Sequence, residues 1–185
     1  FAEQMLEADD ASAKAELLLL APSVRVPRLT HGAISVWDTL AIGEYLNEIK
    51  PKAGLLPPDA AARAHCRSVC GEMHSGFSAL RSALLKARFP NFTVWSRAKA
   101  DICRVTEIWQ ECLKSYGGPY LFGSAPTLAD AMYAPVATRF LTYDVALDEV
   151  CAAYCRTIMA MPAMQEWMAA AVEEPDDIEE LEMEF

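Results

Sequence analysis

Residues 26–46 constrain the fold more than any other part of the chain. They read VPRLTHGAISVWDTLAIGEYL, and a short apolar strand around residues 24–29 contains Pro27. A proline deletes a ladder hydrogen bond and is tolerated in sheets mainly at edges and bulges. The strand is therefore predicted to keep one backbone edge open for a ligand.

The residues after this strand predict a hairpin that leads directly into a helix. A turn at residues 30–32 reverses the chain into a second strand at residues 34–37. Asp38 and Thr39 then occupy the start of a helix, ahead of its apolar positions. Unpaired N–H groups of the helix start and a hydroxyl group should thus converge beside the open edge.

Composition and charge exclude several classes of protein. The 185 residues are 53% hydrophobic and 23% charged, enough for a substantial core in one large or two small domains. The formal charge is -10, but residues 173–185 contain eight carboxylates and no Lys or Arg, and the charge is -2 without them. Nucleic acid and anionic membranes require clustered basic residues. We therefore expect neither as a partner and interpret the acidic tail as a solvated end.

Apolar runs and cysteines point to a soluble cytoplasmic protein. No apolar run reaches the ~20 residues that span a bilayer. The six cysteines do not form a disulfide-rich pattern, and the pairs Cys66/Cys70 and Cys151/Cys155 are four residues apart within predicted helices. That spacing puts both members on one helix face and suits a bridge poorly.

The hydrophobic period changes once along the chain, which predicts a domain boundary. Residues 1–49 mix strand-like and helical segments, including a helix at 11–20, and residues 50–58 form a linker rich in proline and glycine. Residues 59–185 favour a period of 3.6 residues. The predicted helices of this second, all-helical domain are 59–87, 96–116, 127–143, 147–161 and 163–172.

Three segments carry a resemblance to a known family. The V-P-x-L of residues 26–29, the W-D-T-x-A-I-x-E-Y-L of residues 37–46 and the T-L-A-D-A-M-Y-A-P of residues 127–135 resemble the cytosolic glutathione transferases. The resemblance covers nearly the whole chain. It implies an α+β fold, in which a partial thioredoxin-like domain precedes the all-helical transferase domain.

The resemblance also implies a glutathione site. In this family the Val-Pro proline is cis, the residue before it pairs through its backbone with the cysteinyl part of glutathione, and an acid-hydroxyl pair holds the γ-glutamyl end. These roles correspond to Pro27, Val26, Asp38 and Thr39. Arg25 is a candidate for the glycine carboxylate by charge and position, and its alternative is an exposed cation that discourages sheet pairing.

The catalytic group is expected outside the sequence. Aligned to the family, Phe1 lies near the start of the second strand, so the first strand and helix are missing, either because the sequence omits them or because the protein is truncated. The Ser, Tyr or Cys that activates the glutathione thiol is expected upstream of Phe1, since a free thiol has a pKa of about 8.5. Compared with the family, a few residues are also missing near Leu84-Leu85.

The resemblance implies that the first long helix of the second domain lines an electrophile pocket, with Met73, His74 and Phe77 as candidates. The alternative is that Met73 and Phe77 are ordinary core residues and His74 a structural histidine. Cys66, Cys70 and His74 share a helix face, but structural zinc sites need four ligands and no fourth is evident. No metal is expected.

Thr127 and Asp130 are predicted to form a capping box at a helix start. The Thr127 hydroxyl can cap the Asp130 amide, while the Asp130 carboxylate reaches back to the Thr127 amide. This motif is structural and carries no chemistry.

The function implied is a glutathione transferase that uses glutathione as co-substrate and conjugates its thiolate to a small apolar electrophile. Two alternatives stay open: a glutathione-dependent isomerase or dehalogenase, and a non-catalytic transferase-like binding module. The resemblance further implies a homodimer.

Overall fold

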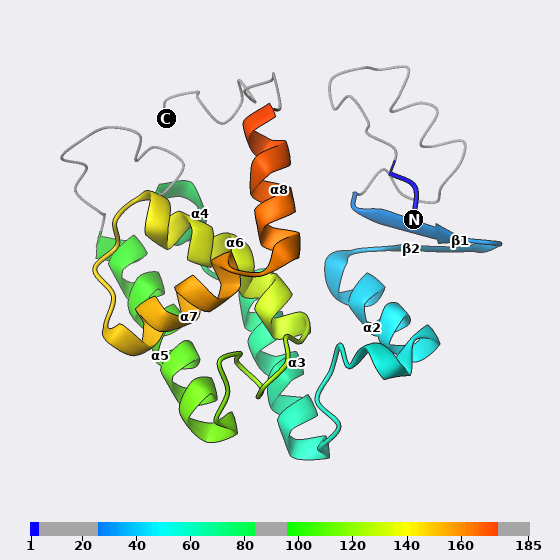
Figure 1. Cartoon of the computed structure of the whole chain (residues 1–185), viewed down its shortest axis with the longest axis horizontal. Helices are drawn as coiled ribbons and strands as arrows, with labels where there is room; N and C mark the ends of the chain where they lie inside the picture. Colours follow the sequence, from blue (N-terminus) through cyan, green and yellow to red (C-terminus); the bar gives the residue numbers. More distant parts are fainter. Residues whose placement is uncertain (4–25, 84–95, 174–185) are drawn as a thin grey trace. The chain divides into compact units, whose positions relative to one another are not determined.

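The chain divides into two compact units, residues 1–53 and 54–185 (Figure 1). The computed structural model describes residues 1–3, 26–83 and 96–173. The division falls inside the range 50–58 that the sequence assigns to a linker. The helix predicted at residues 11–20, Arg25 and the Leu84-Leu85 region lie outside the described residues.

The first unit contains a β-hairpin followed by a helix. Strand β1 (Arg28–His31) pairs antiparallel with β2 (Ile34–Trp37), and α2 (Thr39–Ile49) follows, with one turn of 3-10 helix, η1 (Pro51–Ala53). The turn predicted at residues 30–32 starts two residues before the observed loop at 32–33, and the two overlap at Gly32. His31 pairs with Ile34, so the loop has two residues, and Gly32 at its first position has φ of 60°, a backbone that favours glycine in such turns.

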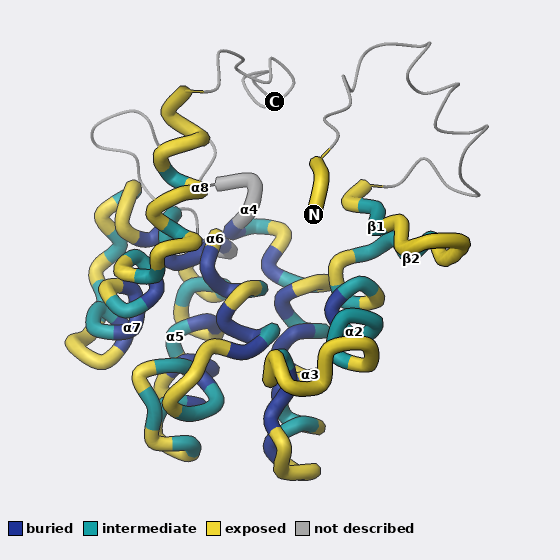
Figure 2. Tube along the Cα trace, turned by 45° about the vertical axis from the view of Figure 1, so that its right-hand side comes forward, coloured by how far each residue is buried: buried dark blue, intermediate teal, exposed yellow. Residues whose placement is uncertain are grey.

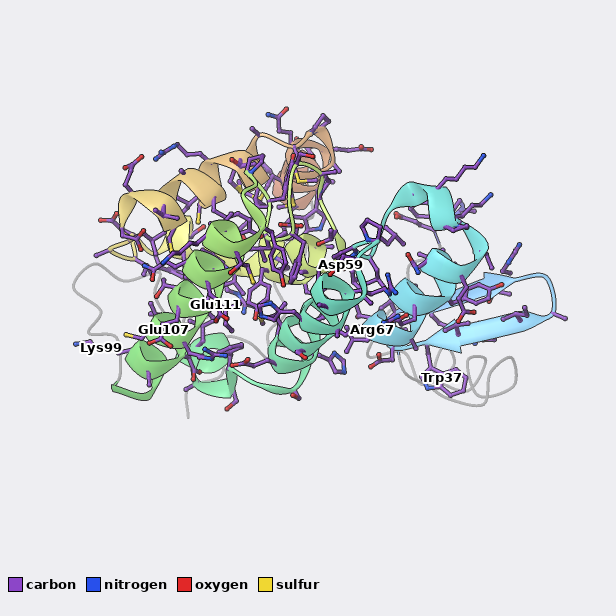
Figure 3. All side chains as sticks on the ribbon, turned by 90° about the horizontal axis from the view of Figure 1, so that it is seen from below. Trp37, Asp59, Arg67, Lys99, Glu107 and Glu111 are labelled. Carbon is purple, nitrogen blue, oxygen red and sulfur yellow. The ribbon has the colours of Figure 1, made fainter. Side chains whose placement is uncertain are left out.

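The two faces of the hairpin have different surroundings. His31 Nδ1 and the Tyr45 hydroxyl of α2 share a hydrogen bond at 2.7 Å, so the His31 face is turned toward that helix. Because side chains alternate along a strand, Arg28 and its ladder partner Trp37 lie on the opposite face. Figure 3 shows Trp37 on the side of the hairpin away from α2.

The second unit is all-helical in its described part. Its helices are α3 (Ala60–Ser75), α4 (Ser78–Ala83), α5 (Ser96–Tyr116), α6 (Leu128–Thr142), α7 (Glu149–Met159) and α8 (Pro162–Glu173). Together with the hairpin and α2 of the first unit, they confirm the predicted α+β class. Pro162 begins α8, a position where the missing N–H of proline costs no hydrogen bond.

The core of the second unit is built around an aromatic cluster. Trp109 of α5 is fully buried, and its ring lies 4.8 Å from that of Tyr154, 5.4 Å from that of Phe140 and 6.2 Å from that of Tyr133. The Tyr133 hydroxyl donates to the backbone oxygen of Val69 at 3.1 Å, which ties α6 to α3. Figure 2 shows the buried positions on the facing sides of these helices.

The prediction of one continuous helix over residues 59–87 was wrong. Helix α3 ends at Ser75, and α4 begins at Ser78. Phe77 between them has φ of 59°, outside the helical region, and a Cβ at Gly76 would lie 2.6 Å from the Glu72 carbonyl oxygen. The glycine thus allows a close approach at which the helix ends, a feature to which hydrophobic periodicity is insensitive.

Asp130 ties together three parts of the second unit. Its Oδ2 accepts hydrogen bonds from the backbone N–H and the hydroxyl of Thr127, at 2.7 and 3.0 Å. Its Oδ1 accepts from the backbone N–H of Leu121 at 2.9 Å and from the Tyr154 hydroxyl at 3.2 Å. Burial raises the pKa of Asp130, and the four hydrogen bonds oppose that shift. The capping box therefore extends into a network that fixes α6, α7 and the loop between α5 and α6.

We expect Asp130→Ala to lower the free energy of unfolding by about 2–6 kcal/mol, because the buried N–H groups of Thr127 and Leu121 would each lose an acceptor at about 1–3 kcal/mol. Urea unfolding at pH 7 measures the change. The control is Asp148→Ala, which removes the exposed cap of α7 and should cost about 1 kcal/mol. Equal losses in the two variants would contradict the central position of Asp130.

The contribution of Asp148 to the free energy of unfolding is expected to depend on pH. A hydrogen bond from the Cys151 backbone N–H lowers the pKa of Asp148 in the folded protein. The stabilisation by Asp148 is therefore present at neutral pH and is lost as the pH falls through the lowered pKa.

Candidate functional site

The hairpin register brings the two predicted glutathione segments to the same end of the hairpin. Arg28 and Trp37 form the outermost ladder pair. The next residues outward are Pro27 on one strand and Asp38 on the other, followed by Val26 and Thr39. Neighbouring strands are about 4.8 Å apart, so segments that are twelve residues apart in sequence meet at one end. The Val26–Pro27 peptide bond is cis.

Asp38 has an unusual backbone at this end of the hairpin. Its φ and ψ are 76° and 131°, and its Oδ1 accepts from the backbone N–H groups of Leu40 at 2.9 Å and Ala41 at 3.2 Å. Sparsely populated backbone conformations cluster at ligand sites, where the surroundings enforce them. The carboxylate thus caps α2 and adds a negative charge to the end of the hairpin.

The groups beside Asp38 are accessible. Val26 is 64% exposed, and Thr39, the first residue of α2, is exposed. Backbone N–H groups in the first turn of a helix favour anions. A zwitterionic peptide would therefore find an acid, a hydroxyl and the backbone N–H of Thr39 at one place. Arg25, the predicted partner of the glycine carboxylate, lies outside the described residues.

The three predicted pocket residues have different exposures. Met73 of α3 and Phe77 after it are buried, whereas His74 is exposed. The buried pair matches the packing expected of core side chains at a spacing of four residues. The assignment of all three to an electrophile pocket stays a prediction.

Sequence reasoning missed two polar atoms on the hairpin. Arg28 Nη1 and Ser35 Oγ are buried and have no hydrogen-bond partner in the structure. Both residues lie on the face away from α2, since Arg28 pairs with Trp37 and Ser35 with Thr30. The sequence feature that could have drawn attention to them is Arg28 itself, a charged residue between the Val-Pro step and the apolar Leu29.

The comparisons with known proteins identify the family. Residues 59–170, more than half of the chain, match the family described as "Glutathione S-transferase, C-terminal domain". The chain belongs to the glutathione S-transferase family. The resemblance inferred from the three sequence segments is thereby confirmed.

Two curated relatives and one solved structure that are similar to this chain are named as maleylacetoacetate isomerases. The chain is 31% identical over 135 residues to a probable maleylacetoacetate isomerase of Caenorhabditis elegans, and 33% identical over 122 residues to the maleylacetoacetate isomerase of Rattus norvegicus. These alignments cover 69% and 65% of this chain, and 63% and 56% of the relatives. The chain thus spans about three-fifths of the length of the curated relatives it matches.

The solved structure is the maleylacetoacetate isomerase of Anaeromyxobacter dehalogenans 2CP-1, with bound dicarboxyethyl glutathione and citrate in the active site. It is 25% identical to this chain, with a TM-score of 0.61, and the match covers 90% of this chain and 79% of that chain. The fold of this family member is therefore that of the glutathione transferases.

The described residues contain no cluster of side chains suited to a metal ion. Across residues 1–3, 26–83 and 96–173, no group of three or more His, Cys, Asp or Glu side chains is arranged to hold an ion. Within the same described ranges, no helix combines the length and the apolar character needed to cross a membrane.

Five of the six cysteines are buried, and Cys103 is exposed. Burial raises the pKa of Cys112 and Cys151 to about 12 and that of Cys155 to about 11. A hydrogen bond from the Cys70 side chain lowers the pKa of Cys66, but that thiol has no exposed surface. Rapid thiol chemistry is therefore expected at Cys103 alone.

We expect a thiol reagent at pH 8 to modify one cysteine quickly in the folded protein and all six after denaturation, because buried thiols are protonated and shielded. Cys103→Ser should abolish the fast phase, and the control Cys151→Ser should leave it intact. The absorbance of released thionitrobenzoate gives both counts. A fast phase of two or more thiols in the folded wild type would contradict the described core.

Proposed function

We propose that this chain binds glutathione along Val26–Pro27 and Asp38–Thr39 and is part of a glutathione-dependent enzyme. The observation that carries the proposal is the hairpin register, which brings these segments together in a member of the glutathione S-transferase family. The 64% exposure of Val26 is consistent with backbone pairing to the cysteinyl part of the tripeptide.

The remaining contacts follow from charge. The Asp38 carboxylate would hold the ammonium group of the γ-glutamyl residue, and the hydroxyl and backbone N–H of Thr39 would hold its carboxylate. Arg25 would bind the glycine carboxylate. Met73, His74 and Phe77 are proposed to contribute to an electrophile pocket. We further propose a cytoplasmic homodimer.

Two reactions can follow from a bound glutathione thiolate. In conjugation, sulfur attacks an apolar electrophile, the new C–S bond stays and a leaving group departs. In isomerisation, sulfur adds to a cis double bond conjugated to a carbonyl, the resulting single bond rotates, and sulfur leaves to restore the double bond as trans. Conjugation is the main proposal.

The relatives give a specific reason to carry isomerisation as the second candidate. The two curated relatives are named maleylacetoacetate isomerases, and the solved one binds dicarboxyethyl glutathione and citrate in its active site. Both ligands carry several carboxylates. If this chain shares that preference, its electrophile would be a carboxylated alkene and not a neutral apolar compound.

Steady-state assays on the purified protein distinguish the candidates. Conjugation predicts turnover of glutathione with 1-chloro-2,4-dinitrobenzene, followed at 340 nm. Isomerisation predicts conversion of maleylacetoacetate that stops when glutathione is withheld. Glutathione binding without either reaction would favour the non-catalytic module.

For the binding site, we expect Asp38→Asn to weaken glutathione binding about 10-fold or more, because one charge-assisted hydrogen bond is worth about 1.5–3 kcal/mol. Asparagine can still cap α2, so stability should change little. The control is Asp148→Asn, which alters the cap of α7 with the same chemistry. Isothermal titration measures both, and an Asp38→Asn protein that binds as tightly as wild type would contradict the assignment.

A further inference from the structure

The side chain of Arg28 carries a buried hydrogen-bond donor without an acceptor, which is an unfavourable arrangement in a folded protein. Its Nη1 is buried without a hydrogen-bond partner. The large majority of buried side-chain polar atoms in proteins are paired, so each exception needs an explanation. The desolvation cost is larger when the group is charged, as a guanidinium always is.

The rest of this guanidinium is available to a ligand. The side chain of Arg28 forms no ion pair and no hydrogen bond in the described structure, and the residue as a whole is half-buried. Nε and Nη2 do not belong to the buried unpaired atoms, so each keeps some exposed surface. A carboxylate could therefore approach this side of the planar group and accept two parallel hydrogen bonds.

Other arginines of the chain are held by protein groups. Arg104 donates to both carboxylate oxygens of Glu72, at 2.7 and 3.0 Å. Arg63 donates to the carbonyl oxygens of Pro57 and Pro58, at 3.0 and 2.7 Å. Arg28 has no such partner, which separates it from arginines that serve the fold.

The position of Arg28 connects it to the proposed glutathione site. It directly follows Pro27, and it pairs across the hairpin with Trp37, which directly precedes Asp38. Ser35, whose Oγ is also buried and unpaired, lies on the same face, two residues before Trp37 in β2. One face of the hairpin thus carries an unpaired cation and an unpaired hydroxyl beside the ligand-binding end.

We propose that Arg28 binds a carboxylate of the ligand held at this end of the hairpin. The proposal rests on the proposed function. Two carboxylates are candidates: the glycine carboxylate of glutathione, which Arg28 would share with Arg25, and a carboxylate on the group attached to its sulfur. Arg28 is a specificity-determining residue in either case, because it favours the acid form of the ligand over its ester.

The test compares acids with matched esters. Isothermal titration of wild type, Arg28→Met and Arg28→Gln would use glutathione, its glycine monoethyl ester, S-(1,2-dicarboxyethyl)glutathione and the diethyl ester of the dicarboxyethyl group. If the Arg28 variants bind glutathione about 10- to 100-fold more weakly than wild type but bind the monoethyl ester with unchanged affinity, the ligand group is the glycine carboxylate. If only the affinity for S-(1,2-dicarboxyethyl)glutathione falls, the ligand group is a carboxylate of the substituent attached to sulfur.

Three results would overturn the proposal. The first is binding of all four ligands within about two-fold of wild type by both variants. The second is an equal loss for acids and esters, which indicates a structural role. The third is a wild type that binds none of the ligands, and only this result also removes the proposed function.

Thermal unfolding supplies a second readout without ligand. Because Arg28 Nη1 is unpaired in the structure, Arg28→Met removes a buried unsatisfied donor, and the melting temperature should stay equal or rise. A clear fall would favour a role in the fold and count against the proposal. The matched control is Arg156→Gln, which breaks the exposed pair with Glu149 and should alter neither affinity nor acid-ester preference.

Discussion

The helical unit depends on one buried carboxylate that accepts four hydrogen bonds. Asp130 binds the start of its own helix through Thr127, the preceding loop through Leu121 and helix α7 through Tyr154. A carboxylate has about four acceptor sites, so its capacity is used in full. The charge costs desolvation free energy, yet it fixes three chain segments that are far apart in sequence. The aromatic cluster around Trp109 includes Tyr154, so the same network also orients the core.

In the other unit, the ordering element is a ladder of four residue pairs. A hairpin with a two-residue loop fixes which residues meet at its far end, and a slip of one position would move every side chain to the other face. Gly32 sets that register through its positive φ. The proposed ligand segments need no long-range packing to meet, because local strand pairing brings them together.

The parts of the fold that could be predicted are those that rest on local chemistry. Helix α5 has the predicted bounds, and α6 lies within one residue of the prediction, because their apolar periodicity and caps are explicit in the sequence. The break between α3 and α4 was missed because it depends on a close approach of Gly76 to the Glu72 carbonyl. Arg28 was missed for a related reason: a residue type indicates that a charge is present, but only the folded structure indicates that nothing pairs with it.

The two buried nitrogen donors without partners in the described structure illustrate how surroundings decide the meaning of an unpaired group. Trp109 Nε1 belongs to a neutral indole within a cluster of aromatic rings, the nearest of which is 4.8 Å away. Its loss of a hydrogen bond is offset by apolar packing, and aromatic faces attract an N–H weakly. Arg28 Nη1 belongs to a permanent cation, for which burial without a partner costs more than it does for a neutral donor. A neutral donor among rings therefore belongs to the core, whereas an unpaired cation beside a ligand-binding strand end is best explained by an anion that the free protein lacks.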